Sequence, residues 1–166
     1  MVVFLLALFF AHWALKNASS TELIQAAWIG LIVVTVVILV TWAIKIPWGR
    51  VRFRDMVEPY DAFTAWYLPQ GLTGSDSFPS GHSANAMTAV WISLLAFVIP
   101  KWQGKESLLF FVGFFYALIV MVSRVVAGAH FTTDVAAGGL MTISVFWMVL
   151  FIHQKFLTRK TTKTTS

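Results

Sequence analysis

Residues 23–44 read LIQAAWIGLIVVTVVILVTWAI, a run without one Asp, Glu, Lys or Arg. As an α-helix rising 1.5 Å per residue, this run would be about 33 Å long, enough to cross the roughly 30 Å hydrocarbon core of a bilayer. A backbone inside the membrane must satisfy its own hydrogen bonds, and this run lacks the alternating polarity of a barrel strand. The stretch therefore predicts a transmembrane α-helix.

Further apolar segments share this character and are separated by polar connections. They cover residues 2–15, 84–99, 108–122 and 135–152. Segment 2–15, with about 14 apolar residues, would be short for a span, but we expect a helix there as well. The sequence thus predicts an all-α fold: a multi-pass transmembrane helical bundle of about five spans, with residues 1–166 forming a single membrane-embedded domain.

The composition is that of a membrane protein. Of the 166 residues, 58% are apolar and 11% are charged, whereas about 25% are charged in an ordinary soluble domain. This balance excludes a soluble globular protein, a disordered chain and a nucleic-acid-binding module, in spite of a pI near 9.8. The chain has no cysteine, which excludes disulfides, thiolate metal sites and a cysteine nucleophile.

The distribution of charge predicts which side of the membrane each connection faces. If alternate connections lie on opposite sides, one side receives seven Lys or Arg and two Glu, and the other receives five of each sign. The more basic side includes the tail 153–166, and the positive-inside rule makes that side cytoplasmic. We therefore expect the long connection 45–83 and the junction 123–134 on the extracytoplasmic face of the cell membrane.

Those two connections hold the candidate catalytic residues. The first ends in FPSGHS (78–83) and the second reads SRVVAGAHFTTD (123–134). His130 and Asp134 are four residues apart near a helix start, a spacing that would put the carboxylate within reach of the imidazole. His82 comes from a second helix start, where free backbone N–H groups favour an anion.

Two histidines, a carboxylate and several cations on one face are typical of phosphoryl transfer. One imidazole would attack phosphorus, the other would protonate the leaving oxygen, and cations would neutralise the developing charge. The candidate cations are Lys45, Arg52 and Arg124. Other interpretations stay open: the histidine and the carboxylate could form a purely structural hydrogen bond, and Arg50 and Arg54 could simply bind anionic lipid headgroups.

Three motifs, in order along the chain, resemble the signature of the type 2 phosphatidic acid phosphatase superfamily, which vanadium-dependent haloperoxidases share. They are Lys45-x6-Arg52, Pro79-Ser80-Gly81-His82 and Ser123-Arg124-x5-His130-x3-Asp134. Ten positions match at the family spacing. Phe53 stands where the family usually has a proline. Bacterial membrane members usually have six spans, so we expect the first helix to be missing or short.

The resemblance implies a role for each matched residue. His130 would be the nucleophile that forms a phosphohistidine, Asp134 would orient it, and His82 would be the general acid. The phosphate oxygens would be held by Lys45, Arg52, Ser80, Gly81 and Arg124. No metal and no cofactor would be needed. The implied substrate is a lipid phosphate or diphosphate, with undecaprenyl diphosphate, phosphatidylglycerol phosphate and phosphatidic acid as candidates.

The connection between residues 55 and 78 carries an apolar pattern. Aromatic and apolar side chains recur there at helical steps, at Met56, Tyr60, Phe63 and Tyr67, with Trp66 beside them. This pattern predicts a short interfacial helix with an apolar stripe. Phe63, Trp66 and Tyr67 are candidates for contact with a lipid tail. Alternatively, the stripe only anchors the loop at the membrane surface.

Two other functions compete with hydrolysis. A protein that binds or transports phospholipid headgroups would need the same cations but neither the two histidines nor Asp134. A vanadate-dependent oxidase would share the signature, but the lipid-embedded composition disfavours it. The small residues 136–139 (AAGG) would allow close helix packing within one chain or between chains, which leaves the oligomeric state open.

Overall fold

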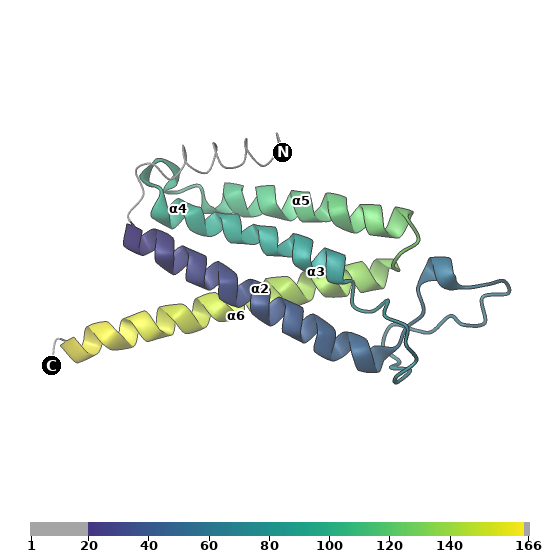
Figure 1. Cartoon of the computed structure of the whole chain (residues 1–166). Coiled ribbons are helices and arrows are strands. Elements are labelled where there is room, and N and C mark those ends of the chain that lie inside the picture. The colour runs from purple at the N-terminus through teal and green to yellow at the C-terminus, as the bar shows by residue number, and fades with distance from the viewer. Residues whose placement is uncertain (1–19, 165–166) are drawn as a thin grey trace.

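The computed structural model describes residues 20–164, and every regular element within them is a helix (Figure 1). The α-helices are α2 (Ser20–Trp48), α3 (Gly81–Met87), α4 (Leu95–Val98), α5 (Glu106–Val126) and α6 (Thr132–Thr164). Short 3-10 helices complete the set: η1 (Phe53–Asp55), η2 (Thr88–Leu94) and η3 (Pro100–Trp102). The prediction of an all-α fold is confirmed. The expected helix over residues 2–15 lies outside the described residues.

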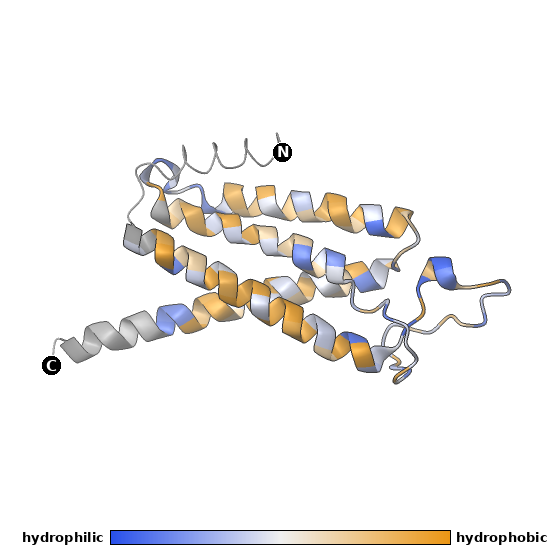
Figure 2. Ribbon diagram, in the orientation of Figure 1, coloured by the Kyte–Doolittle hydropathy of each residue, from blue (hydrophilic) through white to orange (hydrophobic). Residues whose placement is uncertain are grey.

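Three stretches of the described chain are long and apolar enough to cross a membrane: Leu23–Asp55, Glu106–Val126 and Thr132–Lys155. Apolar residues continue around α2 and α5 rather than keeping to one side (Figure 2). Large side chains such as Leu39 and Ile119 are 63% and 71% exposed. Helices that are apolar all round belong in lipid, so the fold is a helical membrane bundle.

The predicted span 84–99 is helical, but it is not one α-helix. α3, η2 and α4 follow one another along a single rod, and the central seven residues are wound as 3-10 helix. Within this rod, the hydroxyls of Thr88 and Ser93 donate to carbonyls three residues earlier, those of Asn85 and Val90. Such local side-chain bonds compete with the regular α-helical pattern.

The hydrophobic core surrounds this rod. Buried side chains of the rod meet those of the three long helices there. They include Met87 and Val90 of the rod, Val33 and Val37 of α2, Ala117 of α5 and Phe146 of α6. Gly113 lets α5 approach closely, since a Cβ added there would lie 2.3 Å from the carbonyl oxygen of Ala89. The rod is therefore held from three sides, and its first turn has a fixed position relative to α6.

The loop between α2 and α3 lies at the same end of the bundle as the α5–α6 connection, as the alternation of successive connections predicted (Figure 1). The loop is tied back to the end of α2 by backbone bonds. Gln70 N donates to Trp48 O at 2.9 Å, and Gly71 N donates to Pro47 O at 3.1 Å. These bonds bring the chemically interesting segments together.

The predicted interfacial helix in this loop is wrong. Residues 56–80 form turns and extended segments with no helix. Pro59 and Pro69 bracket only nine residues, and a proline disfavours helical backbone in the residue before it. Two of the aromatic rings contact other parts of the site along one edge and stay about half exposed: Phe63 lies edge-on to Phe131 at 5.7 Å, and Trp66 lies 6.2 Å from Phe78.

Candidate active site

A cavity of about 370 Å³ opens between α2, the α2–α3 loop, the start of α3 and the α5–α6 turn. Its polar walls are Thr41, Lys45, Arg52, Asp76, Gly81, His82, Asn85 and His130, and Ile38 and Trp42 of α2 add an apolar side. Five of the ten signature residues line this cavity: Lys45, Arg52, Gly81, His82 and His130.

The start of α3 is pinned against the start of α6. Ser80 caps α3, and its Oγ accepts from Ser83 N at 3.3 Å, while its own backbone N–H donates to Asp134 O at 3.0 Å. Gly138 makes this contact fit, because a Cβ at that position would lie 2.5 Å from Ser80 O. Part of the AAGG segment thus serves packing within the chain.

His130 is buried, with 3% of its surface exposed, yet it borders the cavity. Its Nδ1 lies 2.8 Å from the backbone carbonyl oxygen of Ser77. A carbonyl only accepts hydrogen bonds, so Nδ1 carries the proton in the neutral ring and Nε2 keeps its lone pair. Burial, reinforced by the charge of Lys45, lowers the pKa of His130 to about 4. The ring is therefore neutral, which the predicted role as a nucleophile requires.

Asp134 is fully buried, and its carboxylate is shared among three donors. Oδ2 accepts from Ser77 Oγ at 2.5 Å and from Phe131 N at 3.0 Å, and Oδ1 accepts from Arg50 at 2.5 Å. The distance from Oδ2 to His130 Nδ1 is 3.9 Å, too long for a hydrogen bond. The expected direct bond is absent because α6 begins at Thr132, which leaves His130 outside the helix. Asp134 reaches the imidazole through Ser77.

Two cations flank the cavity. Lys45, on the last turn of α2, donates to Pro79 O at 3.2 Å. Arg52 pairs with Asp76 at 2.7 Å, and Lys45 lies 3.8 Å from the same carboxylate. The sequence pattern did not single out Asp76, because nothing in a lone Asp of a long loop shows that it folds back onto both cations.

The remaining signature residues take different places. His82, on the first turn of α3, is exposed at the cavity. Ser80 is fully buried at the helix cap and supports the cavity from behind. Arg124 lies on the last turn of α5, where its Nε donates to Ser123 Oγ at 3.3 Å, and it is not among the described cavity walls.

Arg50 is the residue for which the sequence interpretation fails. It is 3% exposed, so it is not available to lipid headgroups. Its guanidinium bonds Asp134 and Thr133 Oγ1, and its Cζ lies 4.0 Å from the centre of the Phe131 ring. Arg54, by contrast, has 51% of its side chain exposed. Arg50, Arg52 and Arg54 occupy every second position of the sequence, and this spacing alone does not show which arginine is buried and which is exposed. Gly49, at φ +58°, turns the chain just before Arg50 and sends it inward.

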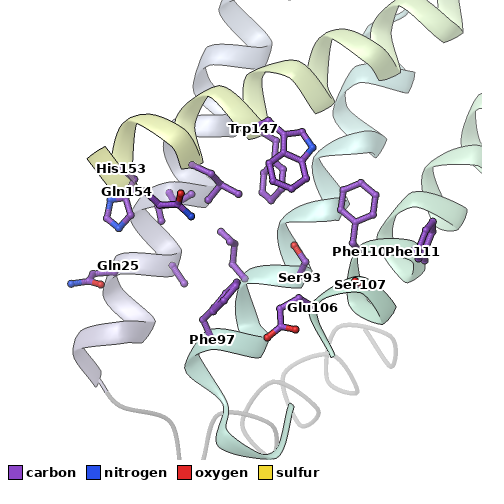
Figure 3. A pocket seen from close by; sticks show the side chains of 15 residues that line it. Gln25, Ser93, Phe97, Glu106, Ser107, Phe110, Phe111, Trp147, His153 and Gln154 are labelled. Atoms are coloured by element: carbon purple, nitrogen blue, oxygen red, sulfur yellow. The ribbon is translucent and has the colours of Figure 1, made fainter. Parts of the chain in front are cut away.

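A second cavity, of about 580 Å³, lies at the opposite end of the bundle (Figure 3). Most of the side chains that line it are apolar, among them Phe97, Phe110 and Trp147. Its described walls contain neither Lys nor Arg, so it offers no cation for a phosphate. Within residues 20–164, no group of three or more His, Asp or Glu is arranged to hold a metal ion.

The family model of the PAP2 superfamily matches residues 28–158, which is most of the chain. The chain belongs to the PAP2 superfamily. This is the type 2 phosphatidic acid phosphatase superfamily that the three motifs resemble, so the sequence prediction of the family is confirmed.

Curated relatives in the PAP2 superfamily carry the names of lipid phosphatases. Phosphatidylglycerophosphatase B of Bacillus subtilis is 33% identical over 92 residues, 54% of this chain and 45% of that protein. Undecaprenyl-diphosphatase of Sulfolobus acidocaldarius is 30% identical over 108 residues, 64% and 48% of the two chains. Lipid A 1-phosphatase of Rhizobium etli is 31% identical over 130 residues, 75% and 50%.

The chain spans about half the length of the curated PAP2 relatives it matches. No solved structure matches it. The family assignment therefore rests on the sequence match, and the arrangement of the site rests on the geometry described above.

Proposed function

We propose that this chain is an integral membrane phosphatase that hydrolyses a lipid phosphate or diphosphate through a phosphohistidine formed at His130, without a metal or cofactor. The observation that carries the proposal is the state of His130: a neutral imidazole whose Nδ1–H is held by the Ser77 carbonyl, at the edge of a cavity with two cations. An oriented imidazole beside cationic groups is the arrangement that nucleophilic attack on a phosphate requires.

In the first step, Lys45 and Arg52 bind the phosphate oxygens, together with the N–H groups at the start of α3. His130 Nε2 attacks phosphorus, so that a P–N bond forms and the bond from phosphorus to the leaving oxygen breaks. His82 donates its proton to that oxygen. As the P–N bond forms, the imidazole becomes positive, and the Ser77 carbonyl and the Asp134 carboxylate stabilise it.

In the second step, a water molecule attacks the phosphohistidine. His82, now unprotonated, takes a proton from the water while the P–N bond breaks. His130 returns to its neutral form and inorganic phosphate leaves. His82 thus gives one proton to the leaving oxygen and recovers one from the water, while His130 carries the phosphoryl group between the two steps, and no other co-reactant is needed.

The substrate class is a lipid that carries a terminal phosphate or diphosphate. The curated relatives are named for three different lipids, and a phosphate on a membrane lipid is what they share. Undecaprenyl diphosphate, phosphatidylglycerol phosphate and phosphatidic acid are the candidates. Phe63, Trp66 and Tyr67 are 57%, 49% and 62% exposed beside the site and are proposed to contact the lipid.

We place the cavity on the extracytoplasmic face of the cell membrane. The connection between α4 and α5 and the C-terminal part of α6 lie at the opposite end of the bundle from the α2–α3 loop (Figure 1), and these segments carry Lys101, Lys105 and Lys155. The positive-inside rule then makes that opposite end cytoplasmic. Arg124 is kept as a candidate phosphate ligand that would have to turn away from Ser123 when substrate binds.

The test is phosphate release by the detergent-purified chain, with EDTA present, from each of the three candidate lipids. We expect the wild type to release phosphate and His130→Ala to release none. His153→Ala is the matched control, since this histidine borders the other cavity, and it should be as active as the wild type. Binding of the lipids without any release would support the headgroup-binding function instead.

A further inference from the structure

Arg50 holds the surroundings of His130 from two directions. Through its side chain, it bonds Asp134 Oδ1 at 2.5 Å and Thr133 Oγ1 at 2.9 Å. Through its backbone, its carbonyl accepts from Ser77 N at 2.9 Å. Ser77 and Asp134 are in turn joined by a bond of 2.5 Å from Ser77 Oγ to Asp134 Oδ2. Arg50, Ser77 and Asp134 therefore form a closed ring of hydrogen bonds beside His130 Nδ1.

The same guanidinium also packs on the turn that carries His130. Its Cζ lies 4.0 Å above the centre of the Phe131 ring and 5.8 Å from that of Phe63. Arginine over an aromatic face is attracted by the ring quadrupole, more so when the contact is desolvated. The α5–α6 turn and the start of α6 are thus held at Phe131, Thr133 and Asp134 by a side chain that follows the end of α2.

We infer that Arg50 is a positioning residue of the active site, which fixes Ser77 and Asp134 against His130 and neutralises the Asp134 carboxylate. This inference rests on the proposed function, because it concerns the nucleophile of that reaction. Arg50 does not line the cavity, so it acts through other residues rather than on the phosphate.

The charge of Arg50 matters because the Asp134 carboxylate that it pairs with lies only 3.9 Å from His130 Nδ1. Other charged and titratable groups also face His130: Lys45 from α2, Arg52 and Asp76 from the loop, and His82 from α3. Asp76 is already engaged by both of those cations. Without Arg50, the Asp134 carboxylate would lose its direct ion-pair partner and keep only the influence of Lys45. Its negative charge would then favour the protonated, non-nucleophilic imidazole more strongly.

Two effects should therefore follow when Arg50 is replaced by Met. The loss of the ring of bonds should lower kcat by about 100-fold, the scale of a 1 Å misplacement. The loss of the positive charge should raise the pKa of His130, so the acid limb of kcat/KM should move to higher pH by about one unit. A merely structural role would lower activity at every pH without moving that limb.

The experiment compares Arg50→Met, Arg50→Gln and Arg50→Lys with the wild type in detergent, with EDTA present. The probe is phosphatidylglycerol phosphate, and kcat/KM is measured between pH 4 and pH 8. Both neutral variants should move the acid limb, whereas Arg50→Lys, which keeps the charge, should not. Arg54→Met is the matched control, since half of the Arg54 side chain is exposed and its guanidinium pairs with Asp55, while its backbone bond to Gly128 O is kept in the variant; it should behave as the wild type does.

The variants Arg50→Gln and Arg50→Lys keep the test decisive if Arg50→Met does not fold. An acid limb that stays in place in Arg50→Gln, with kcat within threefold of the wild type, overturns the inference while leaving the proposed function standing. A wild type that releases no phosphate from any of the three candidate lipids, or an active His130→Ala, overturns the proposed function first and the role of Arg50 with it. The two failures are therefore distinguishable in one set of profiles.

Discussion

Gly138 is the position at which the packing of two helices should control the chemistry. A Cβ added there would lie 2.5 Å from the carbonyl oxygen of Ser80, whereas ordinary contacts begin near 3.4 Å. In Gly138→Ala, the start of α3 must therefore move away from α6 by roughly 0.9 Å, the difference between these two distances. The obstacle is backbone, so no side-chain rotation can relieve it.

This displacement acts on the residues that the reaction needs. Ser80 is joined to Asp134 by a backbone bond of 3.0 Å, and His82 follows two residues after Ser80. A misplacement of about 1 Å can cost 100-fold in rate, so we expect Gly138→Ala to lower kcat by about that factor. Alanine is the better helix former by about 1 kcal/mol, so intrinsic helix propensity would favour the variant and is not the cause of the loss.

The assay is phosphate release from phosphatidylglycerol phosphate, with thermal unfolding measured alongside. Gly139→Ala is the control, because its Cβ would meet the flexible ends of Met87 and Met121 at 3.2 and 3.3 Å, and those ends can move aside. We expect Gly139→Ala to keep most of its activity. A Gly138→Ala protein as active as the wild type would refute the reasoning that this helix contact sets the position of the α3 start.

Three further predictions concern individual groups of the site. Asp76→Asn should bind inorganic phosphate several-fold more tightly, because the carboxylate no longer competes for Lys45 and Arg52; the inhibition constant for phosphate measures this, and weaker inhibition would contradict it. His82→Ala should slow release from phosphatidylglycerol phosphate more than from p-nitrophenyl phosphate, whose leaving group needs no proton; equal losses would argue against His82 as the acid. Burial lowers the pKa of His130 to about 4, so protonation of this residue should reduce kcat/KM only as the pH falls toward 4. A fall in kcat/KM that already sets in near pH 6.5, and that the ionisation of the substrate does not explain, would contradict a neutral, buried ring.

Much of the fold could be predicted because membrane helices are read from long apolar runs. Residues 23–44 fall inside α2, and the runs 108–122 and 135–152 fall inside α5 and α6. Alternation of the connections then placed the α2–α3 loop and the α5–α6 turn at one end. Motif spacing singled out half of the residues that line the cavity, namely Lys45, Arg52, Gly81, His82 and His130.

What could not be predicted depends on where helices begin and on which way loop side chains point. The spacing of His130 and Asp134 suggested a direct bond, but α6 begins two residues after His130. Arg50 lies beside Arg52 in sequence, and only the turn at Gly49 sends it into the interior. The aromatic steps between residues 56 and 67 imitate a helix, yet the neighbouring prolines and the packing on Phe131 and Phe78 override that pattern.

The central claim is that a covalent phosphohistidine forms at His130. The most direct measurement is a single turnover with lipid substrate carrying ³²P in its terminal phosphate, with EDTA present, stopped with alkali within the first turnover. We expect label on the protein that is stable in alkali, lost in acid and located on the peptide that contains His130. His130→Ala should carry no label and release no phosphate. Phosphate release that continues in His130→Ala, or label on any other residue, would contradict the account.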